Sequence, residues 1–219
     1  MSEFCLLVVA KAPVAGLAKT RLCPPATPAQ AADIAAAALL DTLDAVRATP
    51  GARPMVALTG ELVQASQSAR LYDGLRHFAV FSQRGKDFAN RLANAHADAA
   101  RLRPGLPVVQ IGMDTPQVTP DLLAHTANRL ADADAVVAPA RDGGWWALAL
   151  RDPAAADHLR TVPMSRADTG EQTVKALTSN GYRTIHGDLL SDVDIVADAL
   201  RVAGEAPEGR FAAAVRSLG

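Results

Sequence analysis

The sequence has few of the residues that build disulfide frameworks, metal clusters and membrane segments. Cysteine occurs only at Cys5 and Cys23 among 219 residues, which excludes a disulfide framework and a recognised cysteine metal motif. The five histidines show neither HxH nor HxxxH spacing, which argues against a zinc site. No apolar run approaches the length of a membrane span, and Lys11 interrupts the apolar run near the amino terminus, which argues against a signal peptide. We expect a cytoplasmic protein with reduced cysteines.

The sequence also has no large excess of positive or negative charge. The chain has 22 Lys and Arg residues against 23 Asp and Glu residues, a formal net charge of −1, which removes the electrostatic argument for a nucleic-acid or anionic-membrane partner. The sequence contains no GxxxxGK[ST] loop, which disfavours a P-loop kinase or ATPase. It contains no GxSxG elbow, which disfavours a serine hydrolase.

The composition and the order of the predicted strands and helices indicate a single α/β domain over residues 1–219. Hydrophobic residues make up 49% of the chain and charged residues 21%, which is typical of a globular protein. Apolar runs predict strands at 4–10, 55–59, 77–81, 107–112, 135–139, 145–150 and 183–186. Helical patterns lie at 28–48, 61–71, 86–102, 120–131, 169–181, 194–202 and 209–218. Their alternation predicts a three-layer α/β/α sandwich around a mainly parallel mixed sheet, while 152–167 gives no clear pattern.

A basic loop follows the first predicted strand. Lys11, Lys19 and Arg21 fall within eleven residues, with Gly16 between them. In open α/β sheets, ligands bind at the carboxyl ends of the strands, where this loop lies. Small residues between the cations leave room for a polyphosphate to approach the backbone. We interpret the loop as an anion-binding site; the alternative is that the three cations are ordinary solvated surface charges.

Acidic residues follow two other predicted strands. Asp114 ends one apolar strand, and Asp192 and Asp194 follow a later short one. Carboxylates from separate strand ends, opposite a basic loop, could hold a Mg²⁺ that bridges phosphates. The alternative for Asp114 is a turn or helix cap.

A glycine pair precedes two tryptophans in the sequence. Gly143 and Gly144 would let a substrate lie close to the backbone, although a hairpin turn explains the pair equally well. In a strand, Trp145 and Trp146 point to opposite faces of the sheet. One of them is therefore expected in the core, and the other could stack on a sugar, a base or a loop.

Five motifs, taken together, resemble a known family. They are AKAPVAGLAKTRL, SQRGKDFANRL, IGMDTP, DGGWWALAL and SDVD. In this order they resemble the bacterial DUF2064 family, whose members are GT-A-like proteins similar to 2-phospholactate guanylyltransferases and molybdenum-cofactor nucleotidyltransferases. The resemblance implies the nucleotide-diphospho-sugar transferase fold and a bound nucleotide.

The resemblance also implies roles for particular residues. The implied nucleotide-binding residues are Ala10, Lys11, Gly16, Lys19, Thr20, Arg21, Gln83, Asp87 and Arg91. Lys19, Arg21 and Asp114 are implied to be catalytic, and Gly143, Gly144 and Trp145 to bind the acceptor. Mg²⁺ or Mn²⁺ would be held by Asp114 and Asp194, with Asp192 as the alternative second ligand.

The sequence departs from the related patterns at several positions. Many GT-A glycosyltransferases carry Asp-x-Asp at the metal strand, whereas Gly112 stands two residues before Asp114 here. This single aspartate looks more like a nucleotidyltransferase. Ile195-Val196 replaces the family's usual Thr-Pro, and 164–166 reads Met-Ser-Arg where the family often has Trp-Ser-Thr, so acceptor recognition is expected to differ.

These features favour a metal-dependent transferase that uses a nucleotide donor. The preferred reaction is nucleotidyl transfer from a nucleoside triphosphate to a small phosphorylated or carboxylate acceptor, with release of pyrophosphate. The second hypothesis is a GT-A-type glycosyltransferase that uses a nucleotide sugar, and the third is a non-catalytic nucleotide-binding module. A homodimer is left open, because the alanine-rich helices could pack on a partner or simply cover the sheet.

Overall fold

The apolar run at the amino terminus forms an interior strand of a seven-stranded sheet, next to the central strand. The computed structural model describes residues 3–218. Its strands are β1 (Phe4–Lys11), β2 (Ala52–Thr59), β3 (Ala79–Ser82), β4 (Val108–Gly112), β5 (Ala135–Pro139), β6 (Trp145–Leu150) and β7 (Thr184–His186). Their order across the sheet is β3-β2-β1-β4-β6-β5-β7. The pairings of β6 with β4 and β5 are antiparallel and the others are parallel, which confirms the predicted mainly parallel mixed sheet.

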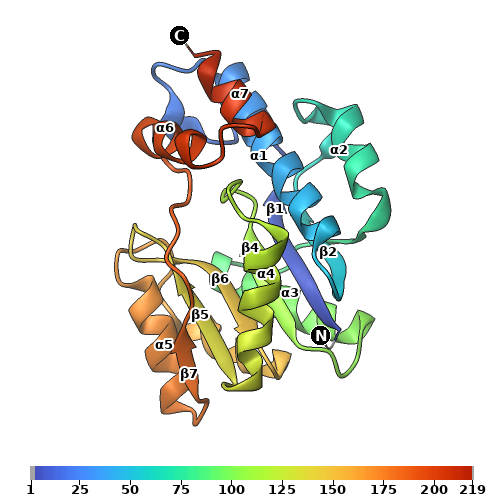
Figure 1. Ribbon diagram of the computed structural model, residues 1–219, viewed down its shortest axis with the longest axis vertical. Coiled ribbons are helices and arrows are strands. Elements are labelled where there is room, and N and C mark those ends of the chain that lie inside the picture. The colour runs from blue at the N-terminus through green and yellow to red at the C-terminus, as the bar shows by residue number, and fades with distance from the viewer. Residues whose placement is uncertain (1–2, 219) are drawn as a thin grey trace.

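Helices cover both faces of this sheet (Figure 1). The α-helices are α1 (Pro28–Ala48), α2 (Ser68–Gly74), α3 (Phe88–Leu102), α4 (Pro120–Asn128), α5 (Thr169–Ser179), α6 (Val196–Glu205) and α7 (Arg210–Arg216). Short 3-10 helices are η1 (Thr20–Leu22), η2 (Leu62–Gln64), η3 (Leu75–His77), η4 (Arg129–Ala131) and η5 (Pro153–Thr161). The described residues contain no helix with the length and apolar character needed to cross a bilayer.

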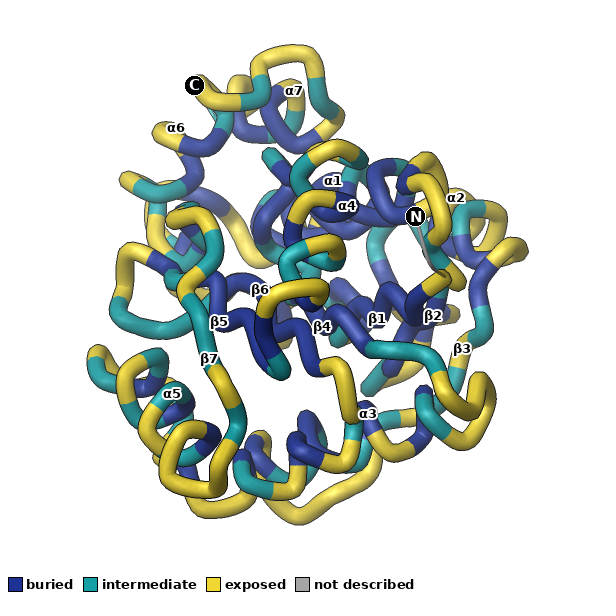
Figure 2. The backbone as a smooth tube through the Cα atoms, turned by 60° about the horizontal axis from the view of Figure 1, so that its bottom comes forward, coloured by how far each residue is buried: buried dark blue, intermediate teal, exposed yellow. Residues whose placement is uncertain are grey.

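Alternate residues of β1 enter two different hydrophobic clusters. Leu6 belongs to the cluster that contains Leu39 of α1 and Leu123 of α4. Leu7 belongs to the cluster that contains Ala95 of α3. Because side chains alternate across a strand, a strand that is apolar at every position can be buried on both faces. Figure 2 shows the result, with the central strands dark and the outer turns of the helices exposed.

A separate hydrophobic cluster joins the two ends of the chain. Phe211 of α7 and Val202 of α6 pack with Ile34 of α1 and with Leu22, which lies just after the basic loop. In Figure 1, α6 and α7 lie beside the start of α1, beyond the carboxyl edge of β1. The carboxyl-terminal helices therefore support the segment that carries the predicted anion-binding loop.

Local sequence signals explain where some elements begin. The predicted capping box of α1 is confirmed, since Gln30 N donates to Thr27 Oγ1 at 3.2 Å and Thr27 N donates to Gln30 Oε1 at 2.9 Å. The continuous helix predicted over 61–71 is wrong, because η2 and α2 are separated at Gln67, which has a left-handed backbone with φ 53°.

Candidate active site

Three chain segments meet at the carboxyl edge of the parallel strands. The first is the basic loop after β1, the second is the turn after β4 that carries Asp114, and the third is the segment 191–194 that follows β7. In Figure 1 the third segment runs from β7 past this edge before it enters α6. The convergence of the basic loop with the acidic residues, predicted from their places after separate strands, is found in the structure.

Lys19 connects the three segments through one ammonium group. Its Nζ donates to Asp114 Oδ2 at 2.9 Å and also to the carbonyl oxygen of Val193. The Lys19 side chain is only 15% exposed, so this ion pair is screened less than a surface pair. Lys19 has a left-handed backbone with φ 48° at the start of η1. A residue other than glycine is uncommon in this conformation, and a strained backbone of this kind is often found at functional sites.

Gly112 and Asp114 fit together at the end of β4. A Cβ added to Gly112 would lie 2.6 Å from Asp114 Oδ1, so an aspartate at 112 would need the Asp114 carboxylate to move. The carbonyl oxygen of Asp114 also accepts a hydrogen bond from Val193 N at 2.9 Å, which fixes the carboxyl-terminal segment against the end of β4.

Asp192 and Asp194 have different electrostatic surroundings. Asp194 pairs with Arg21, and both side chains are substantially exposed. Burial, followed by the negative charges of Asp114 and Asp142, raises the pKa of Asp192 to about 6, and the charge of Lys19 offsets only part of this effect. Asp192 therefore belongs to the group of carboxylates around Asp114, whereas Asp194 is engaged by a guanidinium.

Further hydrogen bonds hold the segment 191–194 in place. Gln117 Nε2 donates to the carbonyl oxygen of Ser191 at 2.6 Å, and Arg201 Nε donates to Ser191 Oγ at 3.1 Å. Sequence reasoning missed Gln117 and Val193. Their contacts run through backbone carbonyl groups, which every residue has, so no residue-type pattern marks them.

Among the other predicted residues of the basic loop, Lys11 contacts the loop itself, whereas Gly16 and Thr20 are exposed. Lys11 Nζ donates to the carbonyl oxygen of Leu17 at 2.8 Å, and Lys11 is exposed. Gly16 has φ 76° and no atom within 4 Å of where its Cβ would be. Thr20 is the first residue of η1 and is exposed. An incoming anion would meet a loop whose ammonium groups already donate hydrogen bonds to the protein's own oxygen atoms.

The predicted residues after β3 have structural contacts. Gln83 Nε2 donates to the carbonyl oxygens of Ala10 and Ala57, at 2.8 and 3.0 Å, and so ties the ends of β1 and β2 together. Asp87 caps α3 by accepting from Asn90 N at 2.8 Å, and this bond, together with the Asn90 side chain, lowers the pKa of Asp87. Arg91 stacks over the Phe88 ring at 5.6 Å.

The residues predicted to bind the acceptor form a tightly packed turn. Gly143 has φ 89°, and a Cβ there would lie 1.8 Å from the carbonyl oxygen of Ala167. The next residue, Gly144, donates its N–H to Asp142 Oδ1 at 2.8 Å. The turn therefore packs closely on the segment before α5 and places Asp142 near the carboxylates of the candidate site.

The two tryptophans point to opposite faces of the sheet, as predicted. Trp145 Nε1 donates to Thr173 Oγ1 on α5 at 3.2 Å. Trp146 is buried in the cluster on the other face, and its Nε1 donates to the carbonyl oxygen of Asp188 at 2.8 Å. Both rings thus have protein partners, and Trp145 is only partly exposed beside the turn.

The donor set suits a cation that keeps water or phosphate ligands. Within residues 3–218, no cluster of three or more His, Cys, Asp or Glu side chains has the geometry to enclose a metal ion. Asp114 and Asp192 supply carboxylate oxygens, and burial together with the negative charges of Asp114 and Asp142 raises the pKa of Asp192, so a bound cation would stabilise its ionised form. Mg²⁺ commonly binds through one or two carboxylates together with substrate phosphates, so these residues fit such an ion.

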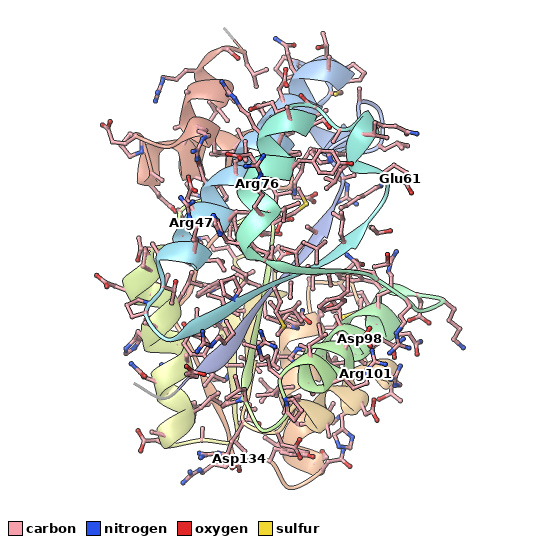
Figure 3. The ribbon with its side chains drawn as sticks, turned by 90° about the vertical axis from the view of Figure 1, so that its right-hand side faces the viewer. Arg47, Glu61, Arg76, Asp98, Arg101 and Asp134 are labelled. Atoms are coloured by element: carbon pink, nitrogen blue, oxygen red, sulfur yellow. The ribbon has the colours of Figure 1, made fainter. Side chains whose placement is uncertain are left out.

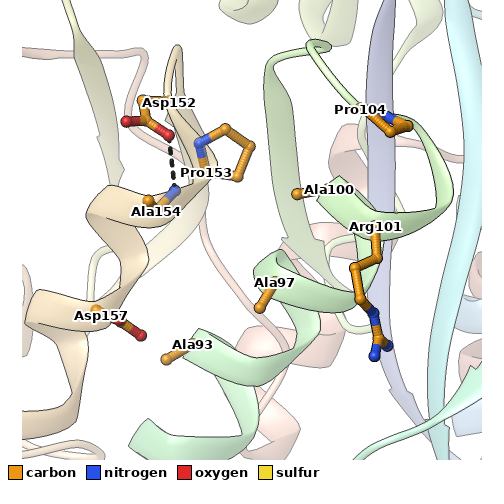
Figure 4. Close-up of a pocket in the computed structure, with 9 residues that line it drawn as sticks. All are labelled: Ala93, Ala97, Ala100, Arg101, Pro104, Asp152, Pro153, Ala154 and Asp157. Carbon is orange, nitrogen blue, oxygen red and sulfur yellow. Dashed lines mark hydrogen bonds between the residues drawn. The ribbon is translucent and has the colours of Figure 1, made fainter.

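A hollow of about 510 Å³ lies away from this edge, between α3 and η5. Figure 4 shows that small side chains, including Ala93 and Ala97, line its α3 side. Opposite them, Asp152 Oδ1 accepts from Ala154 N at 3.0 Å and caps η5. We assign this hollow no ligand, since its polar groups serve the helices that form it.

A family model matches residues 42–166 of the chain. Its description is "Uncharacterized protein conserved in bacteria (DUF2064)". The match covers more than half of the chain and spans the motifs from the end of α1 to the segment before α5. A comparison with curated proteins gave no match.

Solved structures with the same fold cover nearly the whole chain. A proposed nucleotide-diphospho-sugar transferase from Desulfovibrio desulfuricans G20 has a TM-score of 0.85 and 24% identity, covering 99% of this chain and 95% of its own. CMP:2-keto-3-deoxy-manno-octonic acid synthetase complexed with CTP has a TM-score of 0.60 and 11% identity, covering 94% and 99%. Rv0371c from Mycobacterium tuberculosis H37Rv, complexed with manganese, has a TM-score of 0.53 and 21% identity, covering 92% and 97%. These similarities confirm the predicted nucleotide-diphospho-sugar transferase fold.

Proposed function

The chain belongs to the DUF2064 family, and we propose that it is a metal-dependent transferase that uses a nucleotide donor. The reaction we favour is transfer of a nucleotidyl group from a nucleoside triphosphate to a small phosphorylated or carboxylate acceptor, with pyrophosphate as the leaving group. The observation that carries this proposal is the contact of Lys19 with Asp114 and Val193 beside Asp192. The fold shared with a synthetase that binds CTP adds support.

The metal in this proposal is Mg²⁺ or Mn²⁺ held by Asp114 and Asp192. We favour Asp192 over Asp194 as the second ligand, because Asp194 is engaged by Arg21 while Asp192 faces other carboxylates. When bound, such an ion polarises phosphate oxygens and neutralises their charge. The manganese complex of Rv0371c, which shares the fold, is consistent with this assignment.

The chain's own cations have a defined task in this reaction. Lys19 would exchange its bond to Asp114 for a bond to a phosphate oxygen, and Arg21 and Lys11 would add positive charge at the mouth of the loop. These groups would hold the triphosphate in line with the attacking oxygen and stabilise the pyrophosphate as it leaves. A phosphate or carboxylate acceptor is ionised at neutral pH and so needs no general base.

Glycosyl transfer is the second candidate. It is favoured by the overlap with the Desulfovibrio protein, whose TM-score of 0.85 exceeds the 0.60 of the synthetase. In this reaction the same metal and cations would stabilise a departing nucleoside diphosphate. The absence of an aspartate at Gly112 argues for the first candidate.

Product analysis distinguishes these functions. The four nucleoside triphosphates and a panel of sugar nucleotides are each incubated with Mn²⁺ and small acceptors. Pyrophosphate release supports nucleotidyl transfer, and release of a nucleoside diphosphate from a sugar nucleotide supports glycosyl transfer. Nucleotide binding in calorimetry without product formation would indicate the non-catalytic module.

Asp114→Asn tests the site with a matched control. We expect activity to fall by about 100-fold or more, because a metal ligand and a partner of Lys19 are lost. The exposed Asp132 lies outside the site, and Asp132→Asn is expected to retain activity. Full activity of Asp114→Asn without a metal would contradict the proposal.

A further inference from the structure

A second concave surface of the molecule is lined by arginines. It is a hollow of about 790 Å³ between α1, α2, η3 and the start of α7. Its four arginines come from these four elements and are Arg47, Arg70, Arg76 and Arg210. Figure 3 shows Arg47 and Arg76 close together on the face formed by α1 and α2. A cavity of this size can hold a small-molecule ligand.

The lining carries more positive than negative charge. Two carboxylates, Asp44 and Asp73, face the four arginines, and Asp41 pairs with Arg210 from behind the lining, so the group has a formal charge of +1 with His77 neutral. The whole chain has a charge of −1. A concave surface lined by one sign of charge concentrates the field and attracts ions of the opposite sign.

Arg210 is held by Asp41 at 3.0 Å and by Asp44 at 2.7 Å, so the charge available to a ligand comes from the other three arginines. Arg47 pairs with Asp44 at 3.1 Å and Arg76 with Asp73 at 3.3 Å, and in both pairs the side chains are exposed and three residues apart. Such exposed pairs contribute little stability. Among the described residues Arg70 has no carboxylate partner, and its Nη1 donates to Gln67 Oε1 at 3.3 Å.

We propose that this hollow is a second anion-binding site, for a small ligand that carries a phosphate or pyrophosphate group. Guanidinium groups bind phosphate through paired N–H donors, and here those of Arg47, Arg70 and Arg76 converge from three separate elements. The site is distinct from the nucleotide site. None of the residues that line the hollow belongs to the candidate active site.

The competing role for these arginines is to stabilise helix ends. Arg47 lies in the last turn of α1, and Arg76 follows α2 directly. Cations near a helix C-terminus interact favourably with its dipole. That role predicts a loss of thermal stability on substitution with no change in anion binding, so the two roles have different experimental signatures.

Calorimetry with pyrophosphate, without metal, tests the proposal. The measurements use a Lys19→Gln/Arg21→Gln background, in which the loop site is weakened. We expect one remaining site, and we expect Arg70→Gln/Arg76→Gln to weaken its affinity by about 10-fold or more. Amide shifts on adding pyrophosphate should be concentrated in residues 69–77. Parallel titrations with inorganic phosphate show whether one phosphate group is sufficient.

A control variant removes the same charge elsewhere. Arg103 and Arg183 are exposed and lie outside the hollow, and Arg103→Gln/Arg183→Gln should leave pyrophosphate affinity unchanged. The proposal is overturned if no site remains in the background variant, if Arg70→Gln/Arg76→Gln binds as well as its parent, or if the control weakens binding equally. The last result would indicate attraction by overall charge.

Discussion

At the scale of single residues, Gly143 shows how closely the turn beside the site is packed. A Cβ at this position would lie 1.8 Å from the Ala167 carbonyl oxygen, and φ is 89°. Gly105 has a similar φ of 81° but has no atom within 4 Å of where its Cβ would be. The two positions therefore separate the effect of backbone conformation from that of a steric clash.

We expect Gly143→Ala to lower the free energy of unfolding by about 3 kcal/mol or more, because it combines a left-handed backbone with a clash. Gly105→Ala should lower the free energy of unfolding by only about 1 kcal/mol, because this variant has the unfavourable left-handed backbone but no steric clash. Urea denaturation of both variants measures the difference. Equal losses in the two variants would show that the turn can move away from Ala167.

A second residue-scale prediction concerns pH. Burial lowers the pKa of His96 to about 3 from 6.5, and the neighbouring Gln110 side chain offsets only part of this effect. The unfolded chain therefore binds a proton below about pH 6.5 that the folded chain excludes. The stability that neutral His96 provides is complete above pH 6.5 and is lost progressively as the pH falls toward 3.

We expect wild type to lose stability relative to His96→Leu by about 1 kcal/mol per pH unit between pH 6 and 4. Asp192 contributes with the opposite sign, since its raised pKa of about 6 adds stability as the pH falls below that value. Both proteins contain Asp192, so its contribution cancels in the difference. His125 is exposed, and His125→Leu should keep the wild-type pH dependence.

The candidate site could be predicted only in part from single residues. The charges of Lys19, Arg21 and Asp114 are visible in the sequence, and their places after strands indicate a common edge. The choice between Asp192 and Asp194 depends on which carboxylate meets Arg21, a side-chain contact that spacing does not define. The contact through Val193 depends on its carbonyl oxygen and leaves no pattern.

At the scale of elements, the cluster of α6 and α7 with Leu22 supports the basic loop. Phe211 is 1% exposed in this cluster, and Val193 packs there while its carbonyl oxygen accepts from Lys19. We expect Phe211→Ala to destabilise the protein by about 3–5 kcal/mol. Amide exchange should accelerate most in α6, α7 and residues 20–26.

The matched control at this scale is Phe88→Ala. Phe88 is 41% exposed, so its removal leaves no large buried cavity and should cost about 1 kcal/mol or less. If Phe211→Ala accelerated exchange in the central strands as strongly as in α6 and α7, the carboxyl-terminal cluster would not be a separate unit of stability.

Strands were predictable where a continuous apolar run had clear ends. The strands β5 and β6 have their predicted bounds, because short apolar runs ended by Gly or Pro are strong strand signals. The segment 152–167 gave no pattern because η5 is a 3-10 helix, whose period of three differs from that of an α-helix. The break at Gln67 has no glycine or proline to mark it.

At the scale of the whole molecule, the sheet order sets where the fold is most resistant to opening. β1, β4 and β6 lie in the interior of the sheet, whereas β3 and β7 form its edges and have four and three residues. We expect native-state amide exchange to be slowest in β1 and β4 and much faster in β7. Comparable protection of β7 and β1 would contradict this order.

The alternation of elements allowed the layered architecture to be predicted, but not all of its packing. Parallel strands joined by helices require helices on both faces of the sheet. That α6 and α7 pack on α1, beyond the edge of the sheet, depends on long-range contacts between Phe211 and Leu22. Residues nearly 190 positions apart share no local signal.

The bond from Lys19 to Val193 also has a consequence for synthesis on the ribosome. Lys19 and Asp114 are translated early, and the strands that carry them can pair before the carboxyl-terminal segment exists. Val193 is translated after all seven strands of the sheet. The contact of Lys19 with Val193 can therefore form only once every strand has been synthesised.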